Sequence, residues 1–182
     1  MVDAQVTQLV QVTAEAERLV AGIRPDQWTA PTPCGEWTVR ELIDHVTGGD
    51  RLFTAALSGE ERKPAGDDPT TEFHDASADL VAAFELPGVL GKVVTVPFGD
   101  VPGMVALHLR ITEIMVHGWD LARATGQPVS FPDDIVEQEL GFTRGALAAI
   151  PPTRRPFGPP QPAADDAPAL DRLAALLGRP LD

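Results

Sequence analysis

A glutamate and a histidine lie four residues apart in the segment from Thr112 to Leu121. The apolar residues of this segment recur with the period of an α-helix, so Glu113 and His117 are expected on the same helix face, about one turn apart. A carboxylate and an imidazole in this arrangement are suitable ligands for a divalent metal ion. The alternative interpretation is a solvated pair on the surface of an acidic helix.

His45 is a candidate for a third ligand, because it lies in another helical stretch of the chain, from Glu41 to Val46. Three protein ligands leave one coordination position open, as in catalytic zinc sites, whereas structural zinc sites are usually closed by four. Its apolar neighbours also allow His45 to be a core histidine bonded to a backbone carbonyl. The single cysteine, Cys34, excludes an internal disulfide and every site with several cysteines, so a metal ion must be bound by histidine and carboxylate.

Two further polar residues share the face of Glu113 and His117, because they lie three residues before and after this pair. Asp120 is placed to orient the imidazole of His117 from behind. Arg110 is placed either to bind the carboxylate of an anionic substrate or to pair with Glu113 along the helix. His108 lies nine residues before His117 and is expected to face away from the site. The packed side of the helix is expected to consist of Leu107, Ile111, Ile114 and Leu121.

Other residues near the candidate ligands have two interpretations each. Cys34 precedes a predicted helix start, where the helix dipole favours a reactive thiolate, or it is a small buried residue that fixes the loop. Asp44 is either a carboxylate that orients the neighbouring His45 or an ordinary surface residue. Three tryptophans are expected in the core rather than as stacking platforms, namely Trp28, Trp37 and Trp119.

The pattern of apolar residues predicts an all-α protein, an up-and-down bundle with very little strand. The predicted helices are residues 2–21, 38–57, 71–85, 102–125 and 133–150, with a short terminal helix at 168–177. Thr38 and Glu41 have the spacing of a capping box at a helix start. The β-branched segment 92–98 is the one expected strand, as an extended arm or part of a short hairpin. Residues 1–150 are expected to form the bundle, and the proline-rich tail 151–182 to wrap its surface within the same domain.

The charge of the chain argues against two classes of partner. Fourteen basic and 27 acidic residues give a net charge of −13, which repels nucleic acid and anionic membrane surfaces. The sequence contains no apolar stretch long enough to span a bilayer, and its first residues lack the order of a signal peptide, so a cytoplasmic protein is expected. Pairing of two bundles into a homodimer is left open.

Three segments of the chain together resemble a known family: Thr32–Val46, Glu113–Gly126 and Leu173–Pro180. The chain resembles the metal-binding domain of mycothiol-dependent maleylpyruvate isomerases, within the DinB-like superfamily, and specifically an actinobacterial branch of mostly uncharacterised members. The resemblance extends over nearly the whole chain. It implies a DinB-like four-helix bundle in which His45, Glu113 and His117 bind a divalent metal ion, typically zinc.

The resemblance also implies a function, with a low-molecular-weight thiol such as mycothiol as co-substrate and a small electrophile as substrate. The expected activity is therefore that of a metal-dependent S-transferase or isomerase. Arg110 and Asp120 are the residues expected to support the catalysis. Water on the same metal ion would instead give a hydrolase. A non-catalytic stress-response bundle that binds a metal ion or a ligand, or a bundle without metal, is the alternative from another class. The isomerases carry an additional C-terminal domain, which this chain, ending at Asp182, is expected to lack.

Overall fold

The computed structural model describes residues 3–35, 37–97, 99–150 and 157–181. Within these ranges the chain forms six α-helices and one two-stranded sheet, which confirms the all-α fold. The helices are α1 (Ala4–Ala21), α2 (Val39–Ser58), α3 (Pro69–Phe84), α4 (Gly103–Thr125), α5 (Asp133–Ala149) and α6 (Ala169–Leu176). Each lies within two residues of its predicted range; the predicted start at residue 2 and the tail residues 151–156 lie outside the described residues.

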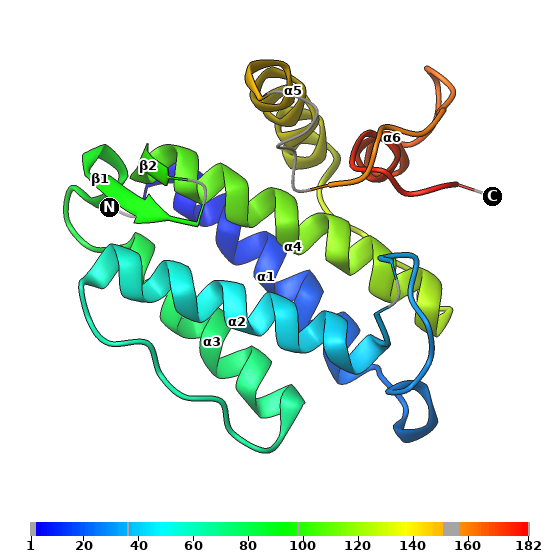
Figure 1. The fold of residues 1–182 in the computed structure, drawn as a ribbon, viewed down its shortest axis with the longest axis horizontal. Coiled ribbons are helices and arrows are strands. Elements are labelled where there is room, and N and C mark those ends of the chain that lie inside the picture. Colours follow the sequence, from blue (N-terminus) through cyan, green and yellow to red (C-terminus); the bar gives the residue numbers. More distant parts are fainter. Residues whose placement is uncertain (1–2, 36, 98, 151–156, 182) are drawn as a thin grey trace.

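Helices α1 to α4 form the four-helix bundle, as Figure 1 shows. Helix α2 packs against α3 and α4, and α1 packs against the other sides of the same two helices. Helices α2 and α3 run in the same direction, because the segment 59–68 returns along the bundle before α3 begins. The direction therefore does not alternate strictly from one helix to the next, and α2 lies antiparallel to α4.

Side chains at the helix starts explain where α2 and α3 begin. The predicted capping box is confirmed, because the amide of Thr38 donates to Glu41 Oε2 at 2.8 Å and the amide of Glu41 donates to Thr38 Oγ1 at 3.3 Å. Helix α3 begins two residues before its predicted start. Asp68 caps it by accepting from the amide of Thr71 at 2.9 Å, and Pro69 fits the first helical position, where no amide hydrogen is needed.

The predicted extended segment forms one arm of a hairpin that leads into α4. Strand β1 (Val93–Val96) pairs antiparallel with β2 (Gly99–Pro102), with Val96 opposite Gly99. The first strand was predicted from its β-branched residues. The hairpin alternative is thus the one observed, although the residues of β2 were not assigned to a strand, because glycine, aspartate and proline are rare in strands and normally indicate a turn.

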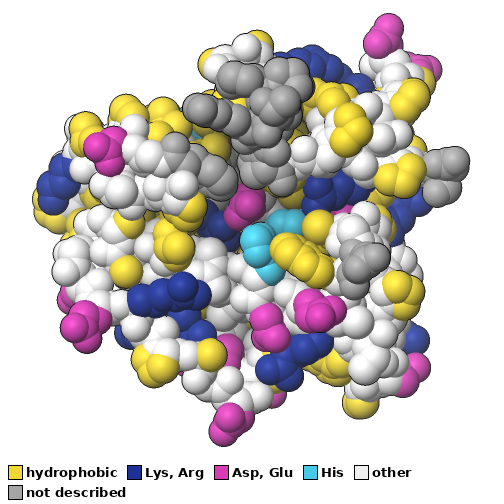
Figure 2. Space-filling view, in the orientation of Figure 1, with side chains coloured by type: hydrophobic (Ala, Val, Ile, Leu, Met, Phe, Trp, Pro, Cys, Tyr) yellow, Lys and Arg dark blue, Asp and Glu magenta, His cyan; other side chains and the backbone are white. Residues whose placement is uncertain are grey.

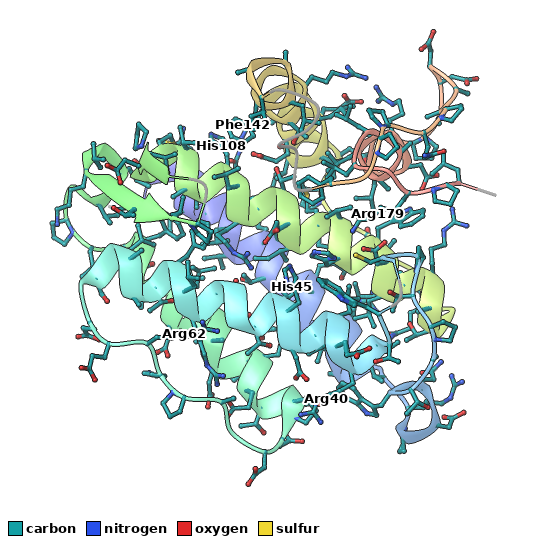
Figure 3. The ribbon with its side chains drawn as sticks, in the orientation of Figure 1. Arg40, His45, Arg62, His108, Phe142 and Arg179 are labelled. Carbon is teal, nitrogen blue, oxygen red and sulfur yellow. The ribbon has the colours of Figure 1, made fainter. Side chains whose placement is uncertain are left out.

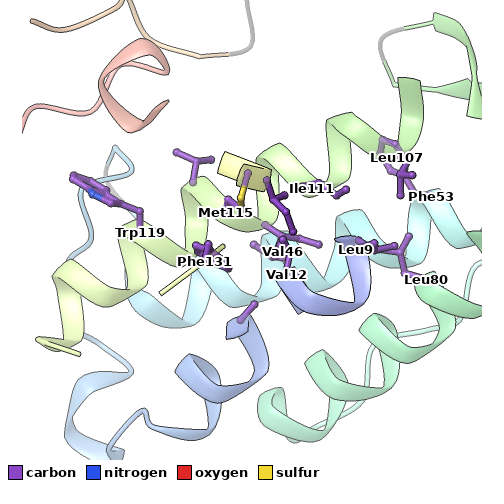
Figure 4. Packing of buried hydrophobic residues seen from close by; sticks show 14 of the residues in the cluster. Leu9, Val12, Val46, Phe53, Leu80, Leu107, Ile111, Met115, Trp119 and Phe131 are labelled. Atoms are coloured by element: carbon purple, nitrogen blue, oxygen red, sulfur yellow. The ribbon is translucent and has the colours of Figure 1, made fainter. Parts of the chain in front are cut away.

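Helix α4 lies in the middle of the molecule. The bundle core packs on one side of it, with buried residues that Figure 4 labels: Leu9, Val12, Val46, Leu80, Leu107, Ile111 and Met115. Helices α5 and α6 pack together on another side of α4 (Figure 1). Polar residues of α4 are therefore buried between two layers and need partners inside the protein. Neither α4 nor any other helix in the described ranges is long and apolar enough to cross a membrane.

Candidate metal centre

The antiparallel packing of α2 and α4 brings the three predicted ligands together. His45 Nε2 lies 3.9 Å from Glu113 Oε1, and the rings of His45 and His117 meet edge to face with centroids 5.1 Å apart. One ligand atom from each of the three side chains lies within 4.8 Å of the others. Figure 3 shows His45 at the centre of the molecule, on the side of α2 near α4. Three donors that are distant in sequence thus share one location.

The site is open on one side and buried on the other. The exposed fraction of the side chain is 39% for His45, 20% for Glu113 and 4% for His117. The core-histidine interpretation of His45 is therefore wrong, as is the solvated-pair interpretation of Glu113 and His117. Figure 2 shows histidine surface in a hollow near the centre of one face, beside acidic and apolar side chains. A small molecule can reach the donors from this face.

The imidazole of His117 is fixed by a buried carboxylate. Its Nδ1 lies 3.1 Å from Asp120 Oδ2, as the spacing on the helix predicted, and Arg179 Nη2 donates to the same oxygen at 2.8 Å. Burial lowers the pKa of His117, although Asp120 acts in the opposite direction. Because a carboxylate only accepts hydrogen bonds, Nδ1 carries the proton in the neutral ring. The lone pair of Nε2 is then available for a ligand.

Glu113 is fixed by a buried ion-pair network. Arg110 Nη1 donates to Glu113 Oε2 at 2.5 Å, and Arg110 Nη2 donates to Asp50 Oδ1 at 2.6 Å. Burial raises the pKa of Glu113, but His45, Arg110 and His117 outweigh it and lower the pKa from 4.5 to about 2. The guanidinium of Arg110 is only 1% exposed, so it pairs with Glu113 and is not placed to bind a substrate carboxylate. Glu113 is held ionised, with its other oxygen facing His45.

Two residues that hold Arg110 in place were not predicted from the sequence. Asp50 is fully buried and binds the guanidinium through Oδ1. Gly49 leaves room for it, because a Cβ atom there would lie 2.5 Å from Arg110 Nη1. A signal for this contact exists in the sequence, since Gly48 and Gly49 lie inside a helix about one turn after His45. Glycine inside a helix costs stability and commonly marks a close approach.

The loop before α2 adds an aromatic ring and a thiol to the site. Trp37 is half-buried and packs against the core, and its ring lies 4.6 Å from that of His45, so it lies at the edge of the core beside the site. Arg179 Nη2 donates to Cys34 Sγ at 3.1 Å, and burial raises the pKa of this thiol, although Arg179 acts in the opposite direction. This favours the structural interpretation of Cys34. Its sulfur also lies within 4.8 Å of donors of His117 and Asp120, but these two already bond to each other.

Two other predicted neighbours lie away from the site. Asp44 pairs with Arg40 at 3.0 Å, is 54% exposed and does not orient His45. His108 faces away from the three donors, as expected, and its Nδ1 lies 2.6 Å from Glu139 Oε1 on α5. Arg179 was not predicted as a residue of the site, because it lies 59 positions after Asp120 and no helical pattern connects the two. It belongs to the tail segment Leu173–Pro180, which contributed to the family resemblance (Figure 3).

A cleft of about 930 Å³ opens next to the three donors. It lies between α4 and α5 beside the hairpin, and Glu113 belongs both to its wall and to the donor group. Phe53 of α2 and Phe142 of α5 contribute aromatic rings to the wall. A small ligand in this cleft would therefore reach the donors from the side of Glu113.

Comparison with known sequences identifies the family. Residues 9–122 match the model of the mycothiol maleylpyruvate isomerase N-terminal domain. An uncharacterized protein of Mycobacterium tuberculosis H37Rv is 36% identical over 165 residues, which cover 88% of this chain and 90% of that protein. A second uncharacterized protein of this strain is 31% identical over 135 residues, covering 62% of this chain and 52% of that protein. The chain belongs to the mycothiol maleylpyruvate isomerase N-terminal domain family, which confirms the resemblance.

Comparison with solved structures agrees on the fold. A crystal structure of the mycothiol-dependent maleylpyruvate isomerase superposes with a TM-score of 0.58 at 18% identity, covering 75% of this chain and 66% of the isomerase. A DinB-like protein of Bacillus subtilis superposes with a TM-score of 0.58 at 15% identity, covering 71% of this chain and 97% of that protein. The DinB-like four-helix bundle is therefore confirmed. The chain spans about two thirds of the isomerase.

Proposed function

We propose that this protein is a divalent-metal-dependent enzyme that activates a low-molecular-weight thiol, such as mycothiol, for reaction with a small electrophile. The observation that carries the proposal is the convergence of His45, Glu113 and His117 on one partly open location. Three protein donors with an open side are the arrangement of catalytic zinc sites. Membership of the mycothiol maleylpyruvate isomerase N-terminal domain family supports a thiol as the co-substrate.

The donor set suits zinc. His117 would bind through Nε2, His45 through a ring nitrogen and Glu113 through Oε1. Donors about 2.1 Å from a tetrahedral zinc ion are about 3.4 Å apart. The separation of 3.9 Å between His45 Nε2 and Glu113 Oε1 is slightly wider, and the exposed ring of His45 has room to move closer. When bound, the metal ion lowers the pKa of a coordinating thiol and thereby favours the thiolate nucleophile near neutral pH.

The surrounding residues position the donors and limit access of water. Asp120 and Arg179 fix the orientation of His117, and Arg110 fixes that of Glu113. Ligands held in this way reorganise little when they bind a metal ion. The ring of Trp37 covers part of His45 on the side of the loop. The apolar cleft beside Glu113 supports an enzyme rather than a protein that only binds metal, because it offers space for an organic substrate.

Metal analysis followed by a thiol-consumption assay tests the proposal. We expect purified protein to bind about one zinc ion per chain and to lose it in His117→Ala. His74→Ala is the matched control, because His74 is an exposed histidine that pairs with Glu17 far from the site. The loaded enzyme should accelerate the reaction of mycothiol with an aryl halide, and His117→Ala should not. Equal zinc content in His117→Ala and the unaltered protein would contradict the proposed ligands.

A further inference from the structure

The cleft beside Glu113 has walls of an unusual composition for a site that uses charged substrates. Glu113 is the one charged side chain among the wall residues that the structure describes. Most of the remaining wall is hydrocarbon, contributed by residues such as Val101, Val105, Leu109 and Phe142. A volume of about 930 Å³ is within the range of pockets that enclose small organic ligands.

The two threonine side chains that line the cleft are already bonded within the protein. Thr112 Oγ1 donates to Glu139 Oε2 at 3.1 Å and lies 3.4 Å from Thr143 Oγ1. The one arginine beside Glu113, Arg110, is buried and bonded to two carboxylates. An anionic group lying along the hydrocarbon part of the cleft would thus lose its hydration without gaining a cation from the described wall, because the metal ion of the proposed function would lie only at the end beside Glu113. Burying a charge in this way is costly.

Two glycines of α5 keep the cleft open. Gly141 and Gly145 are one helical turn apart, both line the cleft, and a Cβ atom at either position would meet no heavy atom of the described residues within 4 Å. Each glycine inside a helix lowers the stability of the helix relative to alanine. Neither packing nor a turn requires them, because both lie inside α5 and have negative φ angles. The space that they leave in the cleft is their remaining structural effect.

We infer that this cleft binds the electrophile, and that the electrophile is an uncharged, largely apolar molecule. The inference rests on the proposed function for its chemistry and on the cleft alone for its binding preference. With an aryl halide, the thiol releases its proton to solvent and sulfur forms a bond to the aromatic carbon. The carbon–halogen bond then breaks, and the halide leaves with the electron pair. The aromatic ring lies against the hydrocarbon wall, with its reacting carbon at the end near Glu113.

A matched pair of ligands tests the preference for uncharged molecules. A chlorodinitrobenzoate and its methyl ester carry the same reacting carbon and differ in one negative charge. Metal-free protein is titrated with the fluorescent apolar dye Nile red, and each compound is tested for displacement of the dye. We expect the ester to bind at least about tenfold more tightly than the acid, because the acid must bury an unpaired charge. Equal or tighter binding of the acid would overturn the inference.

Variants of α5 test the location. Gly145→Leu fills the cleft without touching the three donors, and we expect it to weaken binding of the ester by about tenfold or more. Ala148→Leu is the control, because it adds the same side chain to the exposed surface of α5 outside the cleft. Gly141→Leu repeats the test if Gly145→Leu does not fold. Unchanged binding in a folded leucine variant would place the ligand elsewhere and overturn the inference.

Turnover of the zinc-loaded enzyme separates this inference from the proposed function. If both are correct, the acceleration over the uncatalysed reaction with mycothiol is larger for the ester than for the acid, and Gly145→Leu removes this difference. If the ester binds in the cleft but no thiol is consumed with either compound, the binding preference is supported and the proposed enzymatic function is wrong. Faster turnover of the acid would overturn the inference while leaving the thiol chemistry supported.

Discussion

The ring of His117 is held in one orientation by its neighbours. Its Nδ1 faces Asp120, which is itself held by Arg179, so the ring has one orientation and one available nitrogen. Helical spacing alone predicted the contact between His117 and Asp120, because residues three apart share a face. The same reasoning could not predict Arg179, whose position depends on how a distant segment packs.

We predict that Asp120→Asn weakens zinc binding by about tenfold, within the range found for residues that orient metal ligands. The loss of charge reduces the basicity of His117 and removes the partner of Arg179. Competition with a chromophoric chelator measures the affinity. Asp44→Asn is the matched control, because Asp44 adjoins a donor in sequence but pairs with Arg40 on the surface. Similar losses in both variants would show that Asp120 has no special effect on His117.

At the scale of elements, α2 and α4 pack closely, and the buried side chain of Arg110 lies between them. Two adjacent glycines of α2 meet different surroundings: Gly49 faces Arg110, whereas Gly48 faces the side chain of Arg62. Arg110 cannot move freely, because it is buried and bonded to both Asp50 and Glu113. Arg62 is an exposed residue and can move into solvent.

The two glycines are therefore expected to differ in their tolerance of alanine. Gly49→Ala should lower the free energy of unfolding by about 1–3 kcal/mol, because the added methyl group displaces Arg110. Gly48→Ala should be neutral or raise the free energy of unfolding by up to about 1 kcal/mol, because alanine favours the helix. Urea denaturation measures both. A Gly49→Ala variant as stable as Gly48→Ala would mean that Arg110 adjusts without cost.

Element boundaries were largely predictable, because local side chains determine them. The capping box of Thr38 and Glu41 and the periodic apolar residues of α4 act within a few residues of each other. The common direction of α2 and α3 was not predictable. It depends on the path of the segment 59–68, whose charged and glycine residues fit either a short turn or a long return.

At the scale of the whole molecule, α1 is joined to the connection between α4 and α5. Glu15 accepts a hydrogen bond from the amide of Ser130 at 2.7 Å, and Arg18 Nη2 donates to Glu15 at 2.7 Å and to the carbonyl of Pro128 at 2.6 Å. Burial raises the pKa of Glu15, but the hydrogen bonds from Arg18 and Ser130 outweigh it and lower the pKa below its ordinary value of 4.5. The contact thus favours the ionised carboxylate.

This lowered pKa predicts part of the acid sensitivity of the protein. Below the pKa of 4.5 the unfolded chain binds a proton at Glu15 before the folded protein does. The stabilising contribution is complete above that pH and is lost as the pH falls through the folded-state pKa. Glu15→Gln should therefore lose less stability than the unaltered protein between about pH 6 and about pH 3. Urea denaturation across this range measures the difference, and Glu61→Gln in the exposed connection after α2 is the control. An identical pH dependence in Glu15→Gln would contradict the contact.

The contact between Asp120 and Arg179 has a consequence for biosynthesis, because the two residues are 59 positions apart. A nascent chain that has emerged from the ribosome through α4 already carries all three donors, but not the guanidinium that steadies the carboxylate behind His117. If the three donors bind a metal ion as proposed, His117 would reach its final orientation only after the tail has been translated. A chaperone or protease that binds the chain before Arg179 has been translated would encounter a bundle in which Asp120 lacks its arginine partner.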